Sequence, residues 1–155
     1  MSRPPVGVAL GLDAGSVRIG LAATDPTGTI ASPVATLAGR DRPALWARLR
    51  EEAAARRAER LVVGLPRRMD GSEGDAAERA RALAGEAARE CGLPVEMWDE
   101  RLTTVAAERA LIQAGMRRER RRERIDAVAA AIMLQSWLDS RRRRTDAVAS
   151  GAGGR

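Results

Sequence analysis

The stretch that decides the fold reads Val8-Ala-Leu-Gly-Leu-Asp-Ala-Gly-Ser-Val-Arg-Ile-Gly-Leu-Ala-Ala-Thr24. It contains two short apolar segments joined by a turn of small residues, which predicts a strand–turn–strand hairpin. One carboxylate, Asp13, lies at the end of the first segment, where burial of an unpaired charge is costly and calls for a partner or a cation. The small residues Ala14, Gly15 and Ser16 allow a phosphate or a metal to approach the backbone closely. The hairpin therefore indicates metal- or phosphate-dependent chemistry without deciding between the two.

The composition restricts the chemistry that is available. The chain has 155 residues, enough for one domain with a hydrophobic core. All 27 basic residues are arginines, and histidine is absent from the sequence. This excludes histidine bases, Ser-His triads, lysine Schiff bases and histidine metal ligands. The single cysteine, Cys91, supports neither an internal disulfide nor a zinc site. Acid–base or metal-binding work must therefore be done by Asp and Glu.

The charge and hydropathy of the chain bear on its partners and location. A formal net charge of +6 at pH 7 favours polyanionic partners. No apolar run reaches the length of a membrane span, and the first residues lack the apolar core of a signal peptide. We therefore expect a cytoplasmic protein without membrane association, as a monomer or homodimer.

The rest of the pattern predicts alternating strands and helices. Three strands are expected over residues 6–13, 18–24 and 29–37, the last near a sheet edge because Pro33 cannot donate to a ladder. The following elements are a helix over 42–60, a strand over 61–65, a helix over 75–90, a strand over 94–98, a helix from 103 or 104 to about 114, and a helix over 125–138. We expect one domain over residues 1–140 and a disordered Arg- and Gly-rich tail over 141–155.

This order of elements predicts a mixed α/β sheet, in which a hairpin is joined to parallel strands through right-handed crossovers. Ligands of such sheets bind outside the carboxyl ends of the central strands. Asp13 ends the first strand, and Asp99 and Glu100 end the last, so the two sites face one crevice if these strands run parallel. Asp126 begins the last helix, where a carboxylate is also favoured simply by the helix dipole.

Carboxylates that converge without histidine are typical of sites for the hard cations Mg²⁺ and Mn²⁺. Two such ions about 4 Å apart activate a water and stabilise the leaving oxygen in phosphodiester cleavage. An arginine-dense run from Met116 to Arg124 adjoins Asp126 and would bring backbone phosphates to the crevice. Its alternative interpretation is a solvated run of charge.

Four blocks of the sequence carry a family resemblance. The blocks are Gly11-Leu-Asp-Ala-Gly-Ser-Val-Arg-Ile-Gly20, Val62-Val-Gly-Leu-Pro66 with Asp70-Gly-Ser72, Asp99-Glu-Arg-Leu-Thr-Thr104, and Ile125-Asp-Ala-Val-Ala-Ala130. In this order and spacing they resemble the YqgF/RuvX family of small bacterial RNase H-like nucleases, described as Holliday-junction resolvases or pre-16S rRNA nucleases. Each block alone is weak, but the four together are highly specific and cover the chain from about Val6 to Asp139.

The resemblance implies an RNase H-like fold with strand order 3-2-1-4-5 and the site of a metal-dependent endonuclease. Asp13, Glu100 and Asp126 would be its catalytic residues and would hold two Mg²⁺ or Mn²⁺ ions. Asp99 would contact and orient these ligands without binding the metal itself, or would pair with Arg101 or Arg18. The residues expected to contact nucleic acid are Arg18, Arg117, Arg118, Arg121, Arg122 and Arg124.

The resemblance also implies a reaction, the hydrolysis of ester bonds in nucleic acid. Junction resolvases carry a fourth acid one helical turn after Asp126, where this chain has Ala129 and Ala130. That difference favours 5′-end maturation of pre-16S rRNA, on ribosomal precursor particles, over resolution of branched DNA. The resolvase and a weakly active nucleic-acid-binding module stay as alternatives. An ATP-binding protein of the actin or sugar-kinase type has a similar phosphate loop, but that fold needs a second copy of the module.

Overall fold

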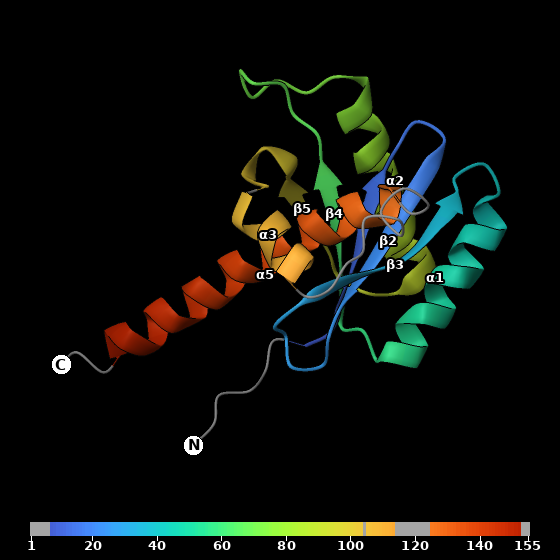
Figure 1. The fold of residues 1–155 in the computed structure, drawn as a ribbon. Coiled ribbons are helices and arrows are strands. Elements are labelled where there is room, and N and C mark those ends of the chain that lie inside the picture. The colour runs from blue at the N-terminus through green and yellow to red at the C-terminus, as the bar shows by residue number, and fades with distance from the viewer. Residues whose placement is uncertain (1–6, 104, 114–124, 153–155) are drawn as a thin grey trace.

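The computed structural model describes residues 7–103, 105–113 and 125–152. One five-stranded sheet has the order β3-β2-β1-β4-β5, and helices cover both of its faces (Figure 1). The strands are β1 Ala9–Ala14, β2 Arg18–Thr24, β3 Ala31–Ala38, β4 Arg60–Leu65 and β5 Val95–Asp99. The helices are α1 Arg42–Arg56, α2 Asp75–Cys91, α3 Val105–Gln113 and α5 Ile125–Ala152, with a short 3-10 turn η1 over Glu100–Leu102. The predicted fold class and the strand order 3-2-1-4-5 are therefore confirmed.

Strand direction brings the expected site together. β1, β2 and β3 form an antiparallel meander, whereas β1, β4 and β5 run parallel. The carboxyl ends of these three parallel strands therefore meet at one edge of the sheet, where Asp13 is the penultimate residue of β1 and Asp99 is the last residue of β5. β3 lies at the opposite side of the sheet as an edge strand, as Pro33 predicted.

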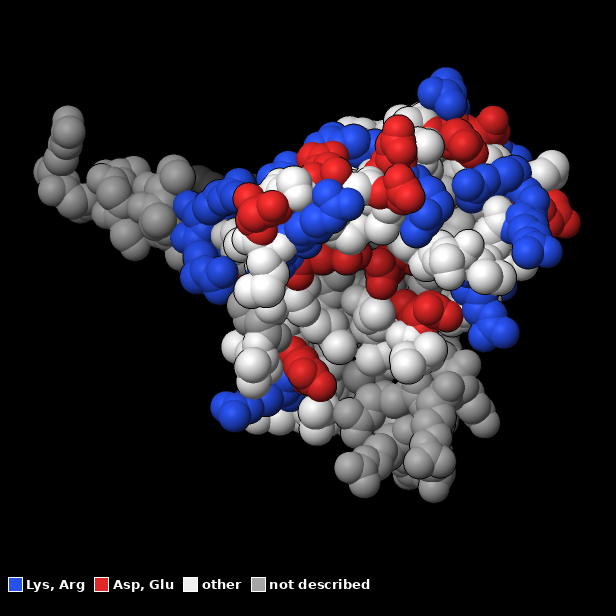
Figure 2. Space-filling model, turned by 90° about the horizontal axis from the view of Figure 1, so that it is seen from above, with Lys and Arg blue, Asp and Glu red and all other residues white. Residues whose placement is uncertain are grey.

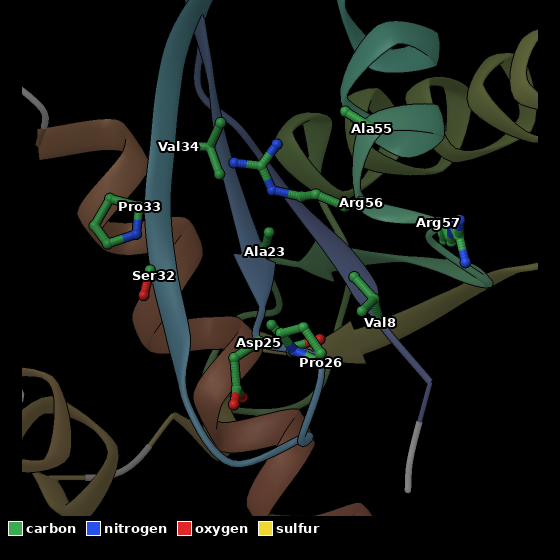
Figure 3. A pocket seen from close by; sticks show the side chains of 11 residues that line it. Val8, Ala23, Asp25, Pro26, Ser32, Pro33, Val34, Ala55, Arg56 and Arg57 are labelled. Carbon is green, nitrogen blue, oxygen red and sulfur yellow. The ribbon is translucent and has the colours of Figure 1, made fainter.

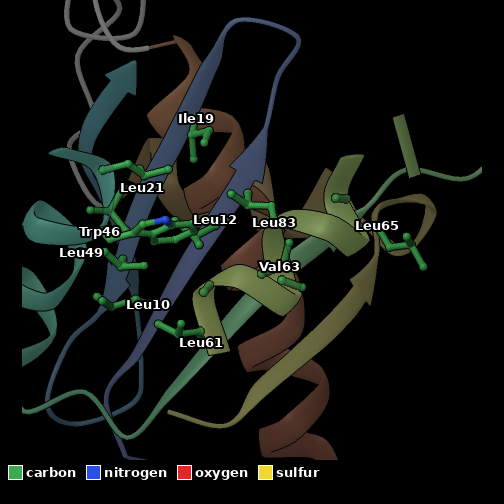
Figure 4. Packing of buried hydrophobic residues seen from close by; sticks show 14 of the residues in the cluster. Leu10, Leu12, Ile19, Leu21, Trp46, Leu49, Leu61, Val63, Leu65 and Leu83 are labelled. Carbon is green, nitrogen blue, oxygen red and sulfur yellow. The ribbon is translucent and has the colours of Figure 1, made fainter. Parts of the chain in front are cut away.

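Alternating strand residues build two separate cores. Leu10 and Leu12 of β1 and Leu61 and Val63 of β4 pack beneath α1 and α2 (Figure 4). Ala9, Ala22 and Val62 face the other way and pack beneath α5 and α3. All three tryptophans, at positions 46, 98 and 137, are buried in these cores.

Two glycines allow α5 to lie close to the sheet. A Cβ on Gly11 would stand 3.1 Å from the Leu134 Cβ, and a Cβ on Gly20 would collide with the backbone carbonyl of Asp126. α5 therefore crosses β1 and β2 so closely that glycine fits best at these two positions. This contact fixes the first turn of α5 over the hairpin formed by β1 and β2.

Two helix ends differ from the sequence prediction. α1 ends at Arg56 and not at residue 60, because Arg57 adopts a left-handed conformation (φ 54°) and its N–H closes the helix on Ala53 and Ala54. The last helix was predicted to end at residue 138 and to precede a disordered tail over 141–155, but α5 continues to Ala152 and projects beyond the sheet (Figure 1). Arginine and alanine are strong helix formers, so the charge run extends the helix.

In the part of the chain that the structure describes, no helix combines the length and the apolar character that crossing a bilayer requires.

Candidate active site

An acidic pair lies at the carboxyl edge of the parallel strands. Asp13 lies near the carboxyl end of β1, and Glu100 follows β5 directly. Burial of Glu100, a hydrogen bond between its side chain and that of Asp13, and the negative charges of Asp13 and Asp99 together raise the pKa of Glu100 from 4.5 to about 8. At neutral pH the Glu100 carboxyl therefore keeps its proton and uses it to donate a hydrogen bond to the Asp13 carboxylate. The two acids expected from the sequence are in contact.

Bare backbone forms the floor beneath these acids. The register pairs Asp13 with Gly20 on β2, and Gly64 of β4 with Trp98 of β5. A Cβ on Gly64 would stand 2.5 Å from the Glu100 Oε1 atom. Glu100 thus occupies the volume that any larger side chain at position 64 would fill.

Asp126 approaches the same edge from above. Its backbone carbonyl lies against Gly20, and its Oδ1 atom lies 3.8 Å from the position of a Cβ on Gly15, in the turn after Asp13. Among the described residues, however, no three His, Cys, Asp or Glu side chains stand close enough together to form a ready-made metal site. The structure brings Asp13 and Glu100 together and places Asp126 over the turn that follows Asp13.

The surface above the strand ends is hollowed, acidic side chains lie in the hollow, and arginines and acidic side chains alternate along one side of it (Figure 2). Acidic groups at the bottom of a concave surface suit a cation, and arginines beside it can attract the phosphates of a ligand.

Asp99 has its own partner. Its carboxylate accepts hydrogen bonds from the Arg101 side chain at 2.7 and 3.1 Å and from the Arg101 backbone N–H at 2.9 Å. The Arg101 hydrogen bond is the main reason that the pKa of Asp99 lies below its usual range. Of the roles that the sequence left open for Asp99, the pairing with Arg101 is the one observed.

Arg101 also ties down the loop over residues 66–74. Its Nη1 atom donates to the Met69 carbonyl at 3.5 Å. Arg67, at the start of the loop, lies 3.9 Å from Asp99 and 3.4 Å from Glu73. Sequence reasoning missed this network, although the turn residues Asp70-Gly-Ser72 indicated a structured loop. The loop is therefore held at the margin of the acidic hollow.

Of the six predicted nucleic-acid contacts, one lies among the described residues. Arg18 is exposed and begins β2, on the strand next to Asp13. The other predicted contacts lie outside the described residues; these are Arg117, Arg118, Arg121, Arg122 and Arg124.

A second hollow, of about 420 Å³, lies at the opposite end of the sheet (Figure 3). Val8 and Ala23 line it together with Asp25 and with Arg56 and Arg57 from the end of α1. Asp25 accepts the backbone N–H groups of residues 29 and 30 at 2.8 and 2.9 Å. Its carboxylate therefore shapes the β2–β3 turn, and this hollow lacks the paired acids of the strand-end site.

A five-stranded mixed sheet of order 3-2-1-4-5 with helices on both faces is the RNase H-like fold. The chain belongs to the RuvX family, since the family model described as "RuvX: Holliday junction resolvase" matches residues 7–140. The family resemblance inferred from the four sequence blocks is confirmed.

Curated relatives match the chain over most of its length. A protein of Pelotomaculum thermopropionicum is 48% identical over 135 residues, which cover 86% of this chain and 88% of the relative. A protein of Moorella thermoacetica is 49% identical over 130 residues, which cover 84% and 93%. Both carry the name "Putative pre-16S rRNA nuclease".

Solved structures share the fold at low sequence identity. Thermus thermophilus RuvC in complex with a Holliday junction substrate aligns with a TM-score of 0.58 and 19% identity, covering 87% of this chain and 96% of that protein. The Holliday junction resolvase of fowlpox virus aligns with a TM-score of 0.51 and 12% identity, covering 86% and 99%. These likenesses establish the RuvC-like architecture.

Proposed function

We propose that this chain is a metal-dependent endonuclease that hydrolyses phosphodiester bonds in precursor 16S ribosomal RNA. The observation that carries the proposal is the contact between Asp13 and Glu100 at the strand ends. It is supported by relatives about 48% identical whose name refers to that RNA. The reaction would take place in the cytoplasm, on ribosomal precursor particles.

The residues present fit a divalent cation. Two carboxyl groups held together in a half-buried position suppress the ionisation of Glu100, and a cation would relieve that cost. All donors are carboxylate oxygens, the ligands that Mg²⁺ and Mn²⁺ prefer. Asp13, Glu100 and Asp126 would hold two ions, which when bound activate water and stabilise the leaving oxygen.

The chain's own groups then prepare the reaction. Glu100 would have to release its proton to act as a ligand, because only the carboxylate binds a cation well. Arg101 occupies Asp99 and so keeps that carboxylate directed at the loop over residues 66–74. The absence of side chains at Gly20 and Gly64 lets the start of α5 and the Glu100 carboxyl lie close against the sheet. Arginines around the hollow would hold the flanking phosphates, with Arg18 among them.

The test is a cleavage assay with Mn²⁺ on a precursor 16S transcript, a four-way DNA junction and a linear DNA duplex. We expect cleavage of the transcript at a defined position. Asp13→Asn removes one ligand and should lower the rate by more than about 100-fold, since even supporting residues of metal sites cost 10–100-fold. Nucleic-acid affinity should be equal or tighter, because a repelling charge is lost. Exposed Glu51 on α1 supplies the control: Glu51→Gln should cut at the parental rate.

Two results would contradict the proposal. One is a chain that binds no divalent cation and cuts none of the three substrates. The other is preferential cleavage of the four-way junction, which would favour a resolvase. Ala129 and Ala130, one turn after Asp126, supply no fourth acid and so favour the RNA substrate.

A further inference from the structure

A hollow at the β3 edge of the sheet lies beside the acidic site and was not part of the sequence prediction. Its volume is about 490 Å³, and it is lined by Val17, Arg18, Thr36, Leu37, Ala38 and Arg40. Two guanidinium groups and no carboxylate are among these lining residues. The positive charge of these lining residues therefore favours an anion in the hollow.

The two arginines are not used by the fold. Many arginines of this chain pair with carboxylates, as Arg81 does with Glu73 at 2.7 Å. Within the described residues, neither Arg18 nor Arg40 forms an ion pair or a side-chain hydrogen bond, and both are exposed. Thr36 adds a hydroxyl whose oxygen is buried without a hydrogen-bond partner in the same part of the chain. The hollow thus combines free cationic groups with an unused polar group in its wall.

Backbone contacts hold this hollow in shape. The Gly15 N–H donates to the Arg18 carbonyl at 2.8 Å and closes the β1–β2 hairpin. The Gly39 N–H donates to the Val17 carbonyl at 3.1 Å and fastens the end of β3 to that hairpin. Arg18 and Arg40 therefore extend from a braced backbone, which lowers the entropic cost of binding.

Strand register places the hollow in line with the acids. Asp13 on β1 pairs with Gly20 on β2, and Gly20 pairs with Thr36 on β3. Two strand spacings, or about 10 Å, separate Asp13 from the β3 position. A strand laid across the sheet edge with one phosphate at the acids would bring another phosphate to the hollow.

We propose that Arg18 and Arg40 form a phosphate-binding subsite that holds the substrate strand beside the bond at Asp13 and Glu100. The subsite rests on the proposed nuclease function for its role, but its binding is measurable without cleavage. Guanidinium groups bind phosphate through paired, charge-assisted hydrogen bonds and suit this task better than point charges.

The test uses the full chain carrying Asp13→Asn, so that binding is measured without cutting. The probe is a fluorescein-labelled (dU)10 oligonucleotide. We expect Arg18→Ala with Arg40→Ala to weaken binding about 10-fold. The slope of log affinity against log salt should fall by about 0.7, as loss of one single-strand phosphate contact predicts. Arg79→Ala, which removes an equally exposed charge from α2, is the matched control and should change neither value.

A spectroscopic measurement places the contact. The Nε–Hε signals of Arg18 and Arg40, assigned from their loss in the single variants, should shift when the oligonucleotide is added, and the Arg79 signal should stay in place. Unchanged signals, or parental affinity in the double variant, would overturn the subsite. If the parent chain cuts nothing while these signals shift, the subsite stands and the nuclease proposal fails. If the Arg18→Ala, Arg40→Ala double variant cuts at the parental rate, the nuclease proposal stands and the subsite proposal fails.

Discussion

Glu100 donates a hydrogen bond to Asp13, and this single contact joins the end of β5 to the end of β1 across β4. Such a contact between two acids requires one of them to be neutral. The protein therefore holds a proton in the place where a cation would bind, and the proton and the cation compete for the same oxygens.

The stability of the metal-free protein should fall as the pH rises. The folded chain keeps the Glu100 proton up to about pH 8, whereas the ordinary pKa of the group is 4.5. Between these values the folded state binds more protons than the unfolded state, so the free energy of unfolding decreases with pH. Thermal unfolding in EDTA from pH 5 to pH 9 measures this slope. Glu100→Gln cannot titrate and should flatten it; an unchanged slope in that variant would assign the effect to another group.

Gly64→Ala should damage the site while sparing the fold. The new methyl group would meet the Glu100 carboxyl, the far end of a flexible side chain that can turn away. We expect a melting temperature close to that of the parent and Mn²⁺ affinity lower by about 10–100-fold, as for other losses of support in metal sites. Calorimetric titration with Mn²⁺ is the measurement. Parental affinity would mean that Glu100 can stay beside Asp13 despite the methyl group.

Gly20→Ala should act in the opposite way, on stability first. Here the added methyl group meets backbone, the carbonyl of Asp126, so α5 must shift as a whole. Overpacking of this kind costs about 1–3 kcal/mol. Gly85→Ala in α2 is the matched control, because its methyl group meets only the Arg89 side chain at 3.6 Å. Replacing a helix-interior glycine stabilises by roughly 0.5–1 kcal/mol, so denaturant unfolding should move the two variants in opposite directions.

Arg101→Ala should release the loop over residues 66–74. It removes the hydrogen bonds to Asp99 and to the Met69 carbonyl. The ion pair is exposed to solvent, so the loss of stability should be small. Trypsin should cut faster after Arg67 and Arg68, which mass spectrometry of the fragments detects. Equal cleavage at these two bonds in parent and variant would show that Arg67 and its partners hold the loop without Arg101.

The sequence was informative wherever a local pattern determined the structure. A strand that ends in a carboxylate, together with parallel strand directions, was enough to bring Asp13 and Glu100 to one edge. Pro33 placed β3 at the margin of the sheet because its ring removes a backbone donor. These features depend on residues that lie close together along the chain.

Other features depend on register and could not be read along the chain. The row that runs from Thr36 through Gly20 to Asp13 arises only from strand pairing, so the hollow beside Arg18 and Arg40 was invisible. The Arg101 contact with Met69 joins residues 32 apart in sequence. The length of α5 was misjudged because a run of arginines has the composition of a disordered tail and the propensity of a helix.

The two glycines beneath the acids have a consequence for the evolution of substrate choice. At Gly20 and Gly64 the floor of the site consists of main-chain atoms, and these atoms are the same whatever the neighbouring side chains are. Mutation can change the depth of this floor only by adding atoms that displace α5 or Glu100. Preference for one nucleic acid over another is therefore expected to depend on side chains around the site. These lie in the loop over residues 66–74 and along the β3 edge, where a substitution does not move the acids.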